Sequence, residues 1–237
     1  MINYLGLIKY YSEKYDKLYL FTIKINLHLL NFFCKQINIK LIIVDNQHID
    51  PDNLYNYIIQ NYNDIMNNSD YLFHGFYDVH RKDIYKNVYQ DIWFNNRDYF
   101  VSLIYLCYNI DPIVRINSFI FERDYELENR TYDNFVKENG DQYILCHFNN
   151  DSFMNKTCNQ YKYINLNKST EIFFDYIKIL ENAKEFHILD SCWGAFIYLL
   201  DCKYRLFKDK TIFLYSLRNY RKMFQHPIQL ENWVFVQ

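Results

Sequence analysis

The sequence predicts an α/β fold of two domains that face a cleft. Short apolar runs of the kind found in buried parallel strands alternate with segments whose apolar residues recur at helical spacing. This alternation appears twice, once on each side of Gly140. The chain has 237 residues, half of them hydrophobic, which is enough for two small cores. We therefore expect an N-terminal domain at residues 1–140 and a C-terminal domain at residues 141–237.

The first half opens on a helix rather than a strand. Its apolar face comprises Leu5, Leu7, Ile8, Tyr11 and Tyr15. Strands are expected at residues 18–23, 39–44 and 71–73, with helices near residues 27–34 and 51–62 between them. A doubly wound domain normally begins with a strand. The first domain is thus predicted to be Rossmann-like but without its usual first strand.

The segment before the predicted boundary is helical. Residues 89–108 predict two short helices or one broken helix, and a further helix is expected from about residue 126 to residue 137. Asn139 and Gly140 follow it as a C-terminal cap, because glycine readily adopts the backbone conformation that ends a helix.

The second half repeats the pattern. Strands are expected at residues 143–147, 161–166, 186–189, 212–216 and 233–236, and helices at residues 170–183, 193–200 and 218–226. This alternation predicts a second Rossmann-like domain, and clefts between such domains commonly bind ligands.

Composition excludes several classes of protein. The formal charge of −2 argues against a general nucleic-acid binder, which usually carries a basic excess. The six cysteines form no CxxC pair, so we expect reduced thiols in a cytoplasmic protein. The start of the chain lacks the features of a signal peptide, and no apolar run approaches the roughly 18 residues of a membrane span. No integral membrane segment is expected.

The stretch from residue 167 to residue 200 carries the clearest functional signal. Ser169 or Thr170 is a candidate helix cap, and Asp190 and Ser191 follow a buried strand just before the next helix. Small polar residues at a helix N-terminus offer free backbone N–H groups and a positive dipole end, which suit a phosphate. An ordinary helix cap is the alternative for Asp190 and Ser191.

Two stretches resemble a known family. KSTEIFFDYIKILENAKEFHILDS, followed by WGAFIYLLD, resembles the donor half of GT-B-type glycosyltransferases, in particular the heptosyltransferase-like branch. GLIKYYSEKYDKLYLF and IKLIIVD resemble part of the acceptor half. The resemblance implies a sugar transferred from a nucleotide-sugar donor to a carbohydrate or glycoconjugate acceptor, with no cofactor. It also implies a donor site formed by His147, Asn149, Ser152, Ser169, Asp190, Ser191, Cys192 and Gly194, with Gly194 allowing close approach of the backbone.

The chain departs from this family in two places. Branch members usually have small residues and a histidine in the helix after Asp-Ser/Thr, where this chain has Cys192, Trp193, Phe196 and Ile197. They also open with a strand and a Gly-Asp loop that supplies the expected catalytic carboxylate, and this chain starts after that point. We therefore keep a second hypothesis, a catalytically degenerate binding or assembly module whose pocket is crowded by Trp193. A nucleotide hydrolase ranks last, since GxxxxGK[ST] and GxGxxG are both absent.

Glycosyl transfer requires a general base for the acceptor and positive charge or N–H donors for the leaving diphosphate. The best candidates for the base are His74, at a predicted strand end, and Asp78 or His80 just after it. Arg81, Lys82 and Arg123 are candidates for neutralising the diphosphate, although Arg123 could instead pair with Glu122 or Asp124. His187 alternates with apolar neighbours and is expected to be buried structure. No metal site is predicted.

Overall fold

The structure is a computed structural model of the 237-residue chain. It describes residues 4–23, 30–31, 33, 35, 37–44, 57–68, 105, 110–148, 161–166, 173–189, 191–215, 228 and 230–236.

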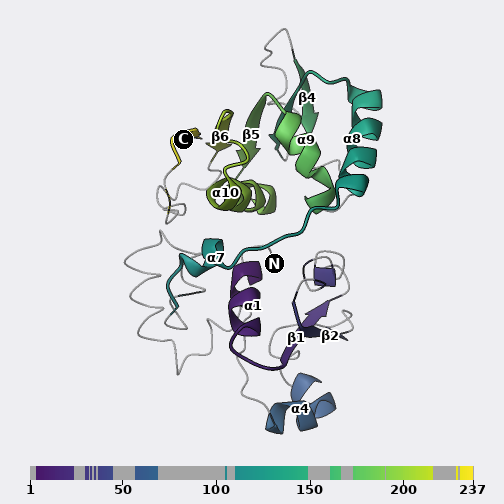
Figure 1. The fold of residues 1–237 in the computed structure, drawn as a ribbon, viewed down its shortest axis with the longest axis vertical. Helices are drawn as coiled ribbons and strands as arrows, with labels where there is room; N and C mark the ends of the chain where they lie inside the picture. The colour runs from purple at the N-terminus through teal and green to yellow at the C-terminus, as the bar shows by residue number, and fades with distance from the viewer. Residues whose placement is uncertain are drawn as a thin grey trace.

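A five-stranded sheet dominates the C-terminal half (Figure 1). Its strands are β3 (Tyr143–His147), β4 (Lys162–Asn165), β5 (Glu185–Leu189), β6 (Thr211–Tyr215) and β7 (Trp233–Val236). They lie in the order β4-β3-β5-β6-β7, and every neighbouring pair is parallel. In chain order within this sheet the arrangement is 2-1-3-4-5, one of the common orders of doubly wound α/β folds. A parallel α/β fold consistent with a Rossmann-like domain is thereby confirmed.

A two-stranded parallel sheet forms in the N-terminal half. Strand β1 (Leu18–Ile23) pairs with β2 (Ile39–Val44), with Leu18 opposite Ile39 and Ile23 opposite Val44. The sequence predicted the bounds of both strands. Residues 30, 31 and 33, where a helix was expected, are helical. The expected strand at residues 71–73 lies outside the described residues.

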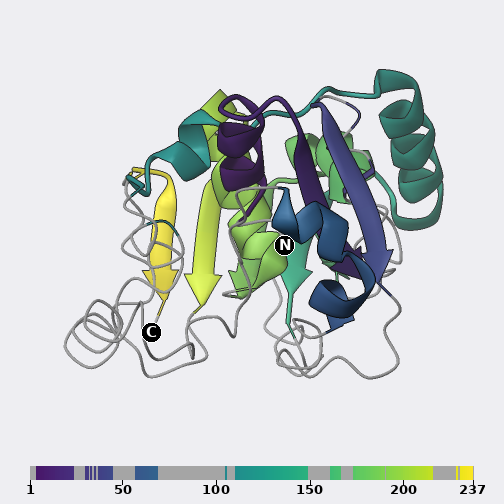
Figure 2. The same ribbon diagram turned by 90° about the horizontal axis from the view of Figure 1, so that it is seen from below.

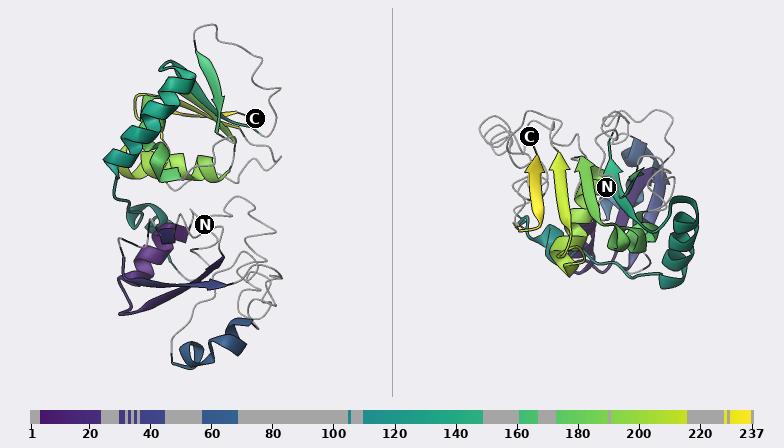
Figure 3. Two further views of the ribbon diagram at one scale, coloured as in Figure 1. Left: turned by 90° about the vertical axis from the view of Figure 1, so that its right-hand side faces the viewer. Right: turned by 90° about the horizontal axis from the view of Figure 1, so that it is seen from above.

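Three helices accompany the larger sheet, and in Figure 3 they lie on one of its faces. They are α8 (Tyr125–Asn139), α9 (Ile177–Asn182) and α10 (Cys192–Tyr204). The side chain of Asp124 caps α8 by accepting a hydrogen bond from the Leu127 N–H (3.0 Å). Gly140 ends α8 with φ 81°, as predicted. Since α8 packs against α9, this helix contacts the second half of the chain although it precedes the predicted boundary at residue 140.

The single regular α-helix predicted over residues 170–183 was wrong. Within the described residues the segment begins as a 3-10 turn, η8 (Phe173–Tyr176), and becomes α9 only at Ile177. Phe174, Asp175 and Tyr176 are consecutive and all buried, so this turn has no polar face toward solvent. Aromatic contacts, including Phe173 against Trp193 at 4.4 Å between ring centroids, hold the tighter turn in place.

Helix α1 (Leu5–Ser12) contacts α7 (Val114–Asn117), and α7 in turn contacts α10. Figure 1 shows α7 between the other two helices. A Cβ atom on Gly6 would lie 2.5 Å from the Arg115 carbonyl oxygen, so the absence of a side chain lets α1 and α7 pack closely. The sequence did not predict α7, because four residues are too few for a recognisable helical pattern.

One hydrophobic core joins the two halves. Leu5, Leu30 and Phe33 from the first half belong to the same buried cluster as Phe186 and Phe196 from the second half. Leu18 and Ile39, from the two-stranded sheet, pack against this cluster. The smaller sheet, seen from below in Figure 2, is therefore anchored to the rest of the molecule by apolar contacts.

The N-terminal half also contains a short helix, α4 (Asn63–Asn67). In the described part of the chain, no helix combines the length and apolar character needed to cross a membrane.

Candidate functional site

The candidate site lies where the strand order of the larger sheet reverses. From β3 the chain proceeds to β4 on one side and then to β5 on the other. In open parallel sheets, ligands bind beyond the carboxyl ends of the strands at such a switch point. His147 is the last residue of β3, and Ser191 follows β5 as the N-cap of α10. The two residues nominated from sequence therefore face each other across this point.

Ser191 makes three hydrogen-bond contacts through one hydroxyl. Its Oγ lies 2.9 Å from His147 Nδ1, 3.1 Å from the Leu189 carbonyl oxygen and 3.3 Å from the Gly194 nitrogen. The hydroxyl has one proton and two lone pairs. If the proton goes to the Leu189 carbonyl, Oγ accepts from Gly194 N–H and from His147 Nδ1–H. This assignment satisfies all three contacts and makes Nε2 the basic nitrogen of His147.

The start of α10 retains anion-binding character. Ser191 occupies the N–H of Gly194, and the preceding N–H groups, of Cys192 and Trp193, have no acceptor within the helix. The first turn contains no acidic residue that would compete with an anion. Cys192 is exposed, so this end of α10 faces outward. The arrangement can hold a phosphate or another oxyanion beside His147.

Gly194 has a structural role, and the approach of a ligand to its backbone stays a prediction. A Cβ atom here would lie 2.7 Å from the Leu189 carbonyl oxygen. The missing side chain therefore allows α10 to pack closely on β5, as the third glycine of dinucleotide-binding turns does.

We expect Gly194→Ala to lower the free energy of unfolding by about 1–3 kcal/mol, because the methyl group must displace backbone. Cys192→Ser, two residues earlier at an exposed position, should change it by less than about 0.5 kcal/mol. Urea unfolding followed by circular dichroism measures both. Equal stability of Gly194→Ala and wild type would refute the close packing.

Trp193 does not crowd the site, contrary to the expectation from sequence. Its side chain is 5% exposed and packs against the rings of Phe173 and Tyr176, at centroid distances of 4.4 and 5.7 Å. Phe196 and Ile197 are also fully buried in the main core. All three bulky side chains are thus part of the hydrophobic core.

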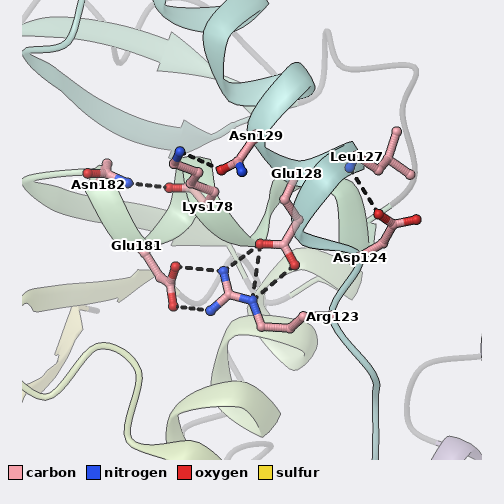
Figure 4. A network of polar contacts seen from close by, with 8 residues as sticks. All are labelled: Arg123, Asp124, Leu127, Glu128, Asn129, Lys178, Glu181 and Asn182. Carbon is pink, nitrogen blue, oxygen red and sulfur yellow. Dashed lines mark hydrogen bonds and ion pairs between the residues drawn. The ribbon is translucent and has the colours of Figure 1, made fainter.

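Arg123 forms a structural ion-pair network (Figure 4). Its guanidinium binds Glu128 in α8, with Nε 3.0 Å from Oε1, and Glu181 in α9, with Nη1 2.6 Å from Oε1. The partners predicted from sequence, Glu122 and Asp124, were wrong. Partial burial alone would lower the Arg123 pKa, but its hydrogen bonds to both carboxylates raise it above the ordinary value. This geometry gives no support to a diphosphate-binding role.

The other nominated residues lie outside the described part of the chain, so their roles stay predictions. They are His74, Asp78, His80, Arg81, Lys82, Asn149, Ser152, Ser169, Thr170 and Asp190.

A second polar cluster, which was not predicted from the sequence, lies on the larger sheet. His187 Nε2 is 2.5 Å from Glu185 Oε1, and its Nδ1 is 2.7 Å from the Tyr215 hydroxyl. The imidazole also stacks on Phe213 at 4.8 Å between centroids. His187 is therefore partly exposed and hydrogen-bonded, rather than buried among apolar neighbours. The i, i+2 spacing of Glu185 and His187, which puts both side chains on one face of the strand, could have predicted their contact. Tyr215 could not be predicted in this way, because it comes from the neighbouring strand β6.

Cysteine reactivity should distinguish the site from the core. Burial raises the pKa of Cys146 to about 12 and that of Cys202 to about 11, so both remain thiols at pH 8. Cys192 is exposed. Among these three residues we expect iodoacetamide to alkylate Cys192 first in the native protein, as read by peptide mass spectrometry. Cys146 and Cys202 should be alkylated rapidly only after unfolding in urea. Equal labelling of all three cysteines in native buffer would contradict this burial.

No group of three or more His, Cys, Asp or Glu side chains in the described ranges is placed to hold a metal ion. Comparisons with protein-family models, curated proteins and solved structures gave no match.

Proposed function

We propose that this protein is a GT-B-like glycosyltransferase that binds the diphosphate of a nucleotide-sugar donor at the switch point of its larger sheet. In this proposal the two halves are Rossmann-like domains facing a cleft. The acceptor, a carbohydrate or glycoconjugate, approaches from the N-terminal side. The observation that carries the proposal is the pairing of His147 with Ser191 at the start of α10.

The chemistry of this site suits a leaving diphosphate. Negative charge develops on the diphosphate as the glycosidic bond breaks, and N–H donors already in position stabilise that charge. The amides of Cys192 and Trp193 supply such donors at the positive end of the helix dipole. The Ser191 hydroxyl oxygen lies 2.9 Å from His147 Nδ1, and this hydrogen bond fixes the orientation of the imidazole ring.

The transfer step also requires a base for the acceptor hydroxyl. His74 and Asp78 remain the proposed bases. His147 is a donor-binding residue in this scheme, and Ser191 positions it. No metal is invoked, because the helix terminus supplies the stabilisation that a metal would otherwise give.

Calorimetric titration with UDP-, GDP- and ADP-sugars tests the proposal. We expect one nucleotide class to bind. His147→Ala and Ser191→Ala should each weaken its binding about tenfold or more, which corresponds to the free energy of one hydrogen bond to a charged group. Lys208→Ala, at an exposed position after α10, should bind as wild type does. Absence of binding by all three nucleotide classes, in a sample that circular dichroism shows to be folded, would reject the proposal.

The alternative is a module that binds the donor without transferring the sugar. It is favoured by one observation: Trp193, Phe196 and Ile197 fill the core at positions where active branch members have small residues and a histidine. An assay for sugar transfer and donor hydrolysis separates the two functions. Turnover that is lost in His147→Ala would eliminate the module, whereas tight binding without turnover would favour it.

A further inference from the structure

Arg115 is a buried arginine at the junction of α1, α7 and α10. It lies in α7, and its side chain is 3% exposed. Its backbone contacts Gly6 of α1, and its guanidinium lies 5.5 Å from the centre of the Tyr198 ring in α10. This cation therefore lies between the elements that join the two halves of the chain.

Two nitrogens of this guanidinium, Nε and Nη2, are buried and have no hydrogen-bond partner in the described part of the chain. They are the two donors of one edge of the planar group. This edge binds the two oxygens of a carboxylate or phosphate in parallel hydrogen bonds. The whole fork, rather than a single N–H, is thus unpaired.

The described surroundings provide no counter-charge. The groups that act on the Arg115 charge are the Tyr105 and Tyr198 hydroxyls and the Cys202 thiol. Burial lowers the Arg115 pKa, and these three groups raise it only in part. Buried charges in proteins are normally paired with an opposite charge, because an unpaired one is costly to desolvate. An oxyanion is the ligand that would satisfy both the charge and the fork.

We propose that the Nε/Nη2 fork of Arg115 binds an oxyanion of the carboxylate or phosphate type between α1, α7 and α10. Both nitrogens are closed to solvent, so the oxyanion enters when α7 shifts away from α1 or α10. The site is separate from the donor site, since Tyr198 and Cys202 lie seven and eleven residues along α10 from Ser191, or about two and three helical turns. Its occupation would link the N-terminal helix to the larger sheet.

Thermal unfolding of the full chain tests this site, with inorganic phosphate or acetate compared against chloride at equal ionic strength. We expect phosphate, acetate or both to raise the wild-type Tm by about 3 °C more than chloride does. The anion that does so identifies whether a phosphate or a carboxylate is recognised. Because the donor site can also hold phosphate, the comparison is made in the His147→Ala background. The shift should persist in His147→Ala and should fall when Arg115→Met is added to it. No shift in His147→Ala, or a shift of equal size in the double variant, overturns the proposal.

Stability without an oxyanion provides a second readout. In chloride alone, Arg115→Met should have a Tm equal to or above that of wild type, because methionine removes the unpaired charge and keeps the packing. A lower Tm in Arg115→Met, with no anion-specific shift in wild type, would show that Arg115 is satisfied within the chain and would overturn the proposal. If Arg115→Met does not fold, the anion-specific shift in Tm is measured in Arg115→Lys instead. Lysine keeps the charge but lacks the fork, so loss of the anion shift supports the site and an unchanged shift rejects it.

Discussion

Replacing Asp201 with alanine should lower the free energy of unfolding by about 3–5 kcal/mol, one of the two largest effects we expect in this protein. Asp201 in α10 is fully buried, and its carboxylate accepts three hydrogen bonds. Oδ1 is 3.1 Å from the Phe207 nitrogen, while Oδ2 is 2.9 Å from Asn232 Nδ2 and 3.0 Å from Trp233 Nε1. Alanine would leave these donors without their acceptor at the junction of α10 and β7.

The matched control for this change is Asp209→Ala. Asp209 is exposed in the turn after α10, so its loss should change stability by less than about 0.5 kcal/mol. Urea unfolding gives the midpoint and the slope, and Asp201→Ala should lower the midpoint without changing the slope. If the two alanine variants were equally stable, the carboxylate would not be holding β7 to α10.

The second large effect concerns Arg123. Arg123→Met should cost about 3–5 kcal/mol, because Glu128 is 1% exposed and would remain as a buried carboxylate without its cation. Glu181, the other partner, has a side chain that is 28% exposed and can be solvated instead. The loss should therefore come mainly from Glu128.

A double-mutant cycle tests this asymmetry. Adding Glu128→Gln to Arg123→Met should recover part of the lost stability, since the glutamine leaves no buried charge. Adding Glu181→Gln should recover little. Equal recovery by the two glutamine variants would contradict the account, as would an Arg123→Met protein as stable as wild type.

Local patterns were sufficient to predict most of the strands. The bounds of β1, β2, β3 and β7 follow directly from short apolar runs. The predicted helices at the positions of α8 and α10 also formed, with the predicted caps at Gly140 and Ser191, whereas the cap at Asp124 was not predicted. Helix α7 was not foreseen, because its four residues are held by contacts with α1 and α10 rather than by a periodic pattern.

The site was predictable only in part, for a related reason. Ser191 was nominated from its place after a strand and His147 through the family resemblance, but their mutual hydrogen bond depends on β3 and β5 being neighbours. Strand order is not encoded in local periodicity. Arg123 shows the same limit: one of its partners, Glu181, is 58 residues away in sequence, and only the packing of α8 on α9 brings the two together.

The most direct test of the proposed donor site is a nuclear magnetic resonance titration of the ¹⁵N-labelled protein with UDP, GDP and ADP. The account predicts that one nucleoside diphosphate shifts the amide resonances of Cys192 and Trp193 and the side-chain resonances of His147, while amides at the start of β3 and β5 stay in place. Shifts confined to other parts of the molecule, or no shift with any of the three at millimolar concentration, would contradict it.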